Sequence, residues 1–178
     1  MVVGNLEFIK SVTGSSVSSL SVTDCFSDKY DVYAMTIPTL DQNSTATFVY
    51  LQYLDSSNTE ITSASYDRAF LVTSAWTTFA EQRATNQTQD WVVAYNQKDT
   101  YGGMGAVMYF FNPYDSSSYT FQTQQSSFIY GGISGGGGFD GYKGIGVLKS
   151  AQQVNGIKLF NASTHTFDNI EVNIYGVK

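Results

Sequence analysis

Apolar and polar residues alternate with a period close to two along most of the chain. The C-terminal segment is the clearest case, because one polar residue separates Ile170 from Val172 and another separates Val172 from Ile174. This period places successive side chains on opposite faces of an extended backbone, so it is typical of a strand with one buried face. It predicts strands at about residues 5–12, 17–24, 30–37, 46–54, 65–73, 90–97, 105–112, 126–133, 142–149, 154–161 and 168–177.

The spacing of these strands indicates the fold class. Regularly spaced short strands without helices between them are typical of an all-β sandwich or barrel. The 178 residues include 13 Tyr and 12 Phe, and only 13% are charged, which suits half-buried sheet surfaces. We expect a single domain over residues 1–178, an antiparallel β-sandwich that is jelly-roll-like and has long loops.

Turn-forming residues mark the ends of several expected strands. Residues 13–16 separate the first two strands at the distance of a β-hairpin. Pro113 should stop the strand that ends at Phe111, because proline cannot donate a hydrogen bond to a central ladder. Asn155-Gly156 can form a tight turn, which would shorten the strand drawn through it. We also expect the first and last strands to pair in one sheet.

Two segments lack the two-residue period. Between residues 74 and 89, Trp76 and Phe79 are three apart, as on a helical turn, but the Thr and Asn content favours a long loop. Gly131–Gly138 is rich in glycine, so it is either a mobile loop or a site where another backbone comes close. It lacks the Lys-Ser or Lys-Thr pair of a phosphate-binding loop.

Charge and cysteine content exclude several classes of function. The net charge of −6 and the absence of a basic run argue against nucleic acid and against an anionic membrane surface. Cys25 is the only cysteine, so no internal disulfide can form, and we expect a buried structural thiol. The first residues resemble no signal peptide, and no apolar run is long enough to span a membrane.

The titratable residues form no recognised catalytic or metal-binding motif. His165 is the only histidine, and we expect it in an exposed turn. Asp24, Asp28 and Asp31 lie close enough in sequence to offer oxygen ligands to calcium. A solvated turn is the alternative that we favour, because Lys29 lies among them. Folding could also create a carboxylate pair for glycoside hydrolysis. The candidates for such a pair are Asp67, Glu81, Asp90 and Asp140. We expect no catalytic residues, no metal and no cofactor.

Aromatic side chains in or beside the expected loops are the main candidates for binding. Such side chains commonly anchor interfaces or stack on sugar rings. A domain with 15% aromatic residues must also place some of them at its edges without any function. The candidates for interface or ligand contact are Trp76, Phe79, Tyr101, Met104, Tyr130, Phe139 and Tyr142.

A succession of short segments carries a resemblance to a known class of proteins. The segments are Leu6–Lys10, Phe26–Tyr33, Leu51–Asp55, Phe111–Pro113, Val154–Phe160 and Ile174–Lys178. In this order they resemble small structural virion proteins of tailed phages, of the marine and cyanobacterial type. The resemblance implies a jelly-roll or β-sandwich domain in capsid decorations, knobs, or tail and fibre parts. It implies no catalytic residues and does not include Gly131–Gly138.

These observations together lead to a functional expectation. We expect a non-enzymatic virion component, assembled in the host cytoplasm, that acts as a capsid decoration or knob and binds other virion proteins as a homo-oligomer. The alternative is a receptor-binding or lectin-like tail-fibre domain for a host surface glycan. Its sugar site would consist of Trp76, Tyr101, Phe139 and Tyr142. An enzyme acting on host polysaccharide ranks last, because no catalytic constellation stands out.

Overall fold

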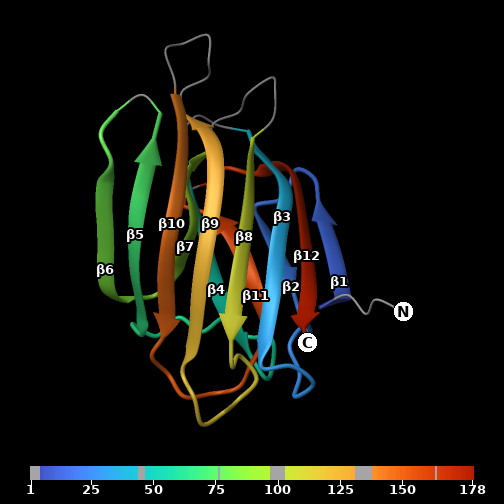
Figure 1. Cartoon of the computed structure of the whole chain (residues 1–178). Coiled ribbons are helices and arrows are strands. Elements are labelled where there is room, and N and C mark those ends of the chain that lie inside the picture. The colour runs from blue at the N-terminus through green and yellow to red at the C-terminus, as the bar shows by residue number, and fades with distance from the viewer. Residues whose placement is uncertain (1–4, 44–46, 76, 97–102, 131–137, 163) are drawn as a thin grey trace.

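The computed structural model describes residues 5–43, 47–75, 77–96, 103–130, 138–162 and 164–178, and none of these is helical. Figure 1 shows two β-sheets, one in front of the other. The strands are Leu6–Gly14 (β1), Ser19–Val22 (β2), Val32–Gln42 (β3), Thr47–Asp55 (β4), Tyr66–Ser74 (β5), Ala80–Gln87 (β6), Asp90–Asn96 (β7), Met104–Phe111 (β8), Thr120–Tyr130 (β9), Gly138–Leu148 (β10), Val154–Asn161 (β11) and Phe167–Val177 (β12). The predicted all-β class is confirmed.

The two sheets differ in size. In the described part of the chain, the large sheet has eight strands in the order β1-β12-β3-β8-β9-β10-β5-β6, and the small sheet has four in the order β2-β11-β4-β7. The orders β1-β12-β3-β8 and β2-β11-β4-β7 follow the same pattern, which is the connectivity of a two-sheet jelly roll. The antiparallel pairs β5–β6 and β9–β10 extend the large sheet beyond this unit. The prediction of an antiparallel β-sandwich is therefore confirmed.

The hydrophobic core lies between the facing surfaces of the two sheets. On β8, Met104, Met108 and Phe110 point inward and are buried, whereas Val107 and Tyr109 point outward and are exposed. This is the period-two alternation that the sequence predicts. Burying one large apolar side chain contributes about 1.5–3 kcal/mol, so the many inward residues of both sheets supply most of the driving force for folding.

Several predicted strand boundaries agree with the structure. The strand β8 ends at Phe111, immediately before the Asn112-Pro113 pair. The first and last strands pair antiparallel, with Leu6 opposite Val177 and Gly14 opposite Ile170. The first and last strands are therefore neighbours at one edge of the large sheet (Figure 1).

Other boundary predictions are wrong. Residues 13–16 do not close a hairpin, because β1 pairs with β12 in one sheet and β2 pairs with β11 in the other. Asn155-Gly156 is no tight turn but part of β11, at a point where the pairing with β4 is irregular. A Cβ on Gly156 would lie 2.3 Å from the carbonyl oxygen of Val22, so the glycine allows the neighbouring strand to approach. The segment 74–89, predicted as a loop, contains the edge strand β6.

A chain of buried hydrogen bonds joins the two sheets. The hydroxyl of Tyr53 on β4 donates to Oε1 of Gln122 on β9 at 2.7 Å, and Nε2 of Gln122 donates to the carboxylate of Asp90 on β7. All three residues are at most 2% exposed. Gly146 on β10 leaves the space for this contact, because a Cβ there would lie 2.1 Å from Oδ2 of Asp90. Burial and the nearby Asp90 charge raise the pKa of Tyr53, so its hydroxyl stays protonated as a donor.

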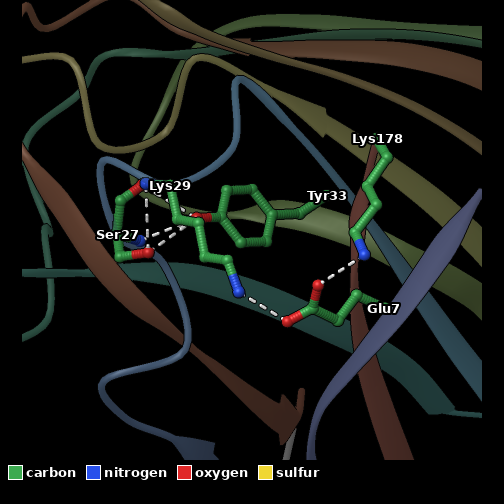
Figure 2. A network of polar contacts seen from close by, with 5 residues as sticks. All are labelled: Glu7, Ser27, Lys29, Tyr33 and Lys178. Carbon is green, nitrogen blue, oxygen red and sulfur yellow. Dashed lines mark hydrogen bonds and ion pairs between the residues drawn. The ribbon is translucent and has the colours of Figure 1, made fainter.

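A second polar network ties the two terminal strands to the segment between β2 and β3. Figure 2 shows Glu7 on β1 between two ammonium groups, with Lys29 Nζ at 2.5 Å and Lys178 Nζ at 2.9 Å. Tyr33 anchors the same segment, because its hydroxyl accepts from the backbone N–H of Ser27 and donates to the Ser27 carbonyl, both at 2.8 Å. Hydrogen bonds, chiefly from Lys29, lower the pKa of Glu7 to about 2.

We predict that Gly146→Ala lowers the free energy of unfolding by about 2–4 kcal/mol, because the added methyl group overpacks the core and displaces the Asp90–Gln122 hydrogen bond. Urea denaturation monitored by fluorescence measures this change. Gly105→Ala on β8 is the matched control, since its Cβ would meet no atom closer than the Ile37 carbonyl oxygen at 3.6 Å. Equal losses in the two variants would contradict the explanation.

We predict that Glu7 contributes to stability at neutral pH but not in strong acid. Its pKa is lowered on folding from 4.5 to about 2, so the contribution is complete above pH 4.5 and disappears as the pH falls towards 2. The Tm of the wild type should therefore exceed that of Glu7→Gln at pH 6, and the difference should shrink towards pH 2. Added NaCl should shrink it at pH 6 as well, because the Glu7 side chain is partly exposed to solvent. A difference that does not depend on pH would refute this assignment.

Candidate interaction surface

The outer face of the large sheet presents apolar side chains to solvent. Five of them, which we call the apolar face, lie on neighbouring strands and are between 39% and 60% exposed. They are Leu71 on β5, Val107 and Tyr109 on β8, Phe121 on β9 and Ile145 on β10. Contiguous exposed apolar patches with polar rims mark protein interaction sites in soluble proteins.

The strand register gathers these side chains. One row of directly opposite residues crosses β8, β9, β10, β5 and β6. In that order it consists of Tyr109, Thr123, Ile145, Ala69 and Arg83. With strands about 4.8 Å apart, this row is about 20 Å long. Residues of the row line a shallow groove of about 1110 Å³. We estimate that the apolar face covers on the order of 400 Å².

Three charged residues lie within or beside the apolar face. Lys143 on β10 lies opposite Leu71, and Leu71 in turn lies opposite Glu81 on β6. Arg83 follows Glu81 on the same outer face of β6, and all three charged residues are exposed. None of the three forms an ion pair with another residue that the structure describes. Their charges are therefore available to a partner.

Of the four sequence candidates whose side chains the structure describes, two are accessible. Phe79 is 66% exposed just before β6, and Phe139 is 58% exposed on β10. Met104 and Tyr142 were expected beside loops, but both belong to the buried core. Tyr142 packs its ring against Phe128 at a centroid distance of 5.5 Å. The expectation that Met104 and Tyr142 are exposed is therefore wrong, because each points inward from a strand.

Other predicted residues lie outside the described part of the chain. Trp76 and Tyr101 are among them, as is most of Gly131–Gly138, of which only Gly138 is described, at the start of β10. Tyr130 is the last residue of β9, and its side chain is not described. Of the four residues proposed for a sugar site, the structure therefore places only Phe139 on the surface.

The acidic cluster near residue 24 does not form a metal site in the described residues. The carboxylate of Asp24 accepts hydrogen bonds from the amides of Asn155 at 2.6 Å and Asn58 at 3.3 Å. These contacts lower its pKa. No group of three metal-ligating His, Cys, Asp or Glu side chains occurs in the part of the chain that the structure describes, so Asp28 and Asp31 do not complete a site with Asp24.

The four carboxylates considered for glycoside hydrolysis do not gather in one place. Asp67 is on the outer face of β5, in an ion pair of 2.8 Å with Lys149. Asp90 is buried between the sheets beside Gln122. Glu81 lies opposite Leu71, which is four residues from Asp67 along β5. Asp140 is on β10, opposite Ser74 at the other end of β5 from Asp67.

The remaining sequence candidates, Cys25 and His165, both make hydrogen bonds with neighbouring residues. Cys25 is 2% exposed, and its thiol donates to the carbonyl of Val22 at 3.4 Å. The predicted buried thiol is thus confirmed, and burial raises its pKa to about 12. His165 precedes β12 and is half-buried, and its backbone carbonyl accepts from the side chain of Asn161 at 3.2 Å.

Sequence reasoning missed the apolar face. Four of its five residues fall on predicted strands, but the period of two implies only one buried face and does not mark the outer face as apolar. A signal was present in Val107–Phe111, where all five consecutive residues are apolar or aromatic and therefore occupy both faces of the strand. A strand with apolar residues on both faces is expected when a second layer covers its outer surface.

Comparison of the chain with family models, with curated proteins and with solved structures finds no match. Within the described residues, no helix is long and apolar enough to cross a membrane.

We predict that Cys25 reacts very slowly with thiol reagents in the native protein. A pKa of about 12 leaves a thiolate fraction of about 10⁻⁴ at pH 8, and burial blocks access. The rate of labelling by a chromogenic disulfide at pH 8 should be at least 100-fold lower in buffer than in concentrated guanidinium. Comparable rates under both conditions would show that the segment around Cys25 opens readily.

Proposed function

We propose that this chain is a non-enzymatic structural component of a tailed-phage particle, a capsid decoration or knob-like protein that binds other virion proteins. The apolar face is the observation that carries the binding part of this proposal. The phage assignment is supported by the resemblance of six short segments, from Leu6–Lys10 to Ile174–Lys178, to small structural virion proteins.

The physical case for binding is the free energy of the exposed apolar surface. At about 25 cal/mol per Å², burying a patch on the order of 400 Å² stabilises a complex by about 10 kcal/mol before the costs of association. Ile145 is at the middle of the cross-strand row and is 60% exposed. It is therefore the side chain from which a docked partner would gain most.

The apolar face also suits a rigid assembly. All of its residues are on strands whose opposite face packs into the core, so little backbone order is lost on binding. Glu81 and Arg83 provide both signs of charge at its rim, and Lys143 places one positive charge between Leu71 and Val107, which gives a partner a defined orientation. A glycan site has less support, because Tyr142 is buried and Phe139 is its one surface aromatic among the described residues.

The test uses purified particles of a phage that encodes this chain. We expect mass spectrometry to detect the protein in the particles, and Ile145→Asp to reduce its incorporation at least tenfold. Phe8→Asp is the matched control, because Phe8 is 58% exposed on the same face but lies on β1, at the far end of the large sheet. Absence of the protein from particles would overturn the proposal. Equal incorporation of both variants would overturn the role of the apolar face.

A further inference from the structure

The strand β6 is an open edge of the large sheet. It pairs with β5 on one side, and no strand of the described residues pairs with it on the other. Its free edge therefore presents backbone N–H and C=O groups that a further strand can bind. Ala80–Gln87 contains neither proline nor lysine, the two residues that most often block such an edge.

The surroundings of β6 leave room for a second strand. None of its residues is buried, in contrast to the neighbouring strand β5, in which Tyr66, Arg68 and Phe70 are buried. Figure 1 shows β6 and β5 extending beyond β7, the edge strand of the small sheet. An approaching strand would therefore meet solvent above and below β6 and would not collide with the small sheet.

The charges on β6 are self-complementary. Glu81 and Arg83 are two residues apart on the outer face, on either side of Gln82. If two copies of β6 pair antiparallel with Gln82 opposite Gln82, Glu81 of each copy lies opposite Arg83 of the other. Opposite charges in directly facing positions stabilise a strand pair, and like charges destabilise it.

We propose that β6 pairs antiparallel with β6 of a second copy of this chain, about a two-fold axis at Gln82, and joins two large sheets into one continuous sheet. The two neighbouring registers, each shifted by two residues, also keep the same faces of the two strands together, but they are disfavoured because they bring like charges together. One places Glu81 opposite Glu81 of the second copy, and the other places Arg83 opposite Arg83. The sequence of β6 thus selects one register among the three central ones.

The length of the pairing is limited by a bulge. Asn86 has a φ of 55°, and its backbone N–H donates to the carboxylate of Asp67 at 2.8 Å. The regular part of β6 is therefore residues 80–84, where Ala80 of one copy would face Ala84 of the other. An interface of about five residue pairs is small, so we expect a weak dimer that forms at high local concentration. This inference concerns a different element from the apolar face and does not rest on the proposed function.

The first test uses cysteine cross-linking of the purified full chain. Gln82→Cys places two thiols opposite each other across the axis, where facing Cα atoms are about 4.5–5.5 Å apart and a disulfide can form. Cys25 is buried and does not compete. In Ala80→Cys or Ala84→Cys the two equivalent thiols are four residues out of register, about 14 Å apart.

We expect Gln82→Cys to form disulfide dimers at least tenfold faster than Ala80→Cys or Ala84→Cys. A mixture of the Ala80→Cys and Ala84→Cys proteins should cross-link faster than either alone, because these residues face each other in the proposed register. Equal rates for all samples would overturn the proposal, since random collisions do not distinguish the positions.

The second test reverses the charges in the Gln82→Cys background. We expect Glu81→Arg and Arg83→Glu to slow cross-linking at least threefold each, because each creates two like-charged pairs across the axis. The double variant restores opposite charges and should return to within twofold of the parent. A double variant as slow as the single ones would overturn the register. Circular dichroism checks that all variants remain folded, and incorporation into particles tests the proposed function separately.

Discussion

The hydrogen bonds from Tyr53 through Gln122 to Asp90 are the interaction on which the arrangement of the two sheets depends. They lie between the sheets beside β7, where the small sheet ends. A buried carboxylate or amide without partners costs several kcal/mol, so these groups must meet in one geometry. Gly146 leaves the space for that meeting. The network thereby fixes how the small sheet packs on the large sheet near β5, whose Tyr66 stacks on Tyr53, while β6 lies beyond the sandwich with no buried residue.

The same polar interior explains which strands the sequence could predict. Strands with apolar inner faces, such as β8 and β12, are evident from alternation alone. The inward residues of β9 include Thr120, Gln122 and Gln124, which are buried but polar, so the first half of this strand gave no apolar period. The strand β6 gave none because neither of its faces is buried. Met104 and Tyr142 were misplaced because nearby glycines, which lie within strands, resemble loop residues in sequence.

The candidate site could be predicted less well than the fold, for a physical reason. Alternation distinguishes the two faces of a strand, but it does not tell which strands become neighbours. The apolar face exists because β8, β9, β10 and β5 are adjacent, although β5 is far from the others in sequence. Ile145 is flanked by Gly144 and Gly146, so no run of apolar residues marks its importance. Only the register of the pairs shows that it lies beside Thr123 and Ala69.

The two edge strands of the large sheet, β1 and β6, differ in how well they are protected against pairing with another chain. At β1, the pairing with β12 is irregular between Phe8 and Lys10, and the ammonium of Lys10 donates to the carbonyl of Thr23 at 2.7 Å. A bulge and a lysine at a sheet edge both hinder pairing with another chain. The β6 edge has no such lysine and carries a self-complementary charge pair over its regular part.

Pairing there would place two apolar faces side by side on one surface on the order of 800 Å², the area that one partner contributes to a stable interface. A weak dimer edge and an apolar face would then act together, because each copy that docks on a particle raises the local concentration at which the next copy pairs.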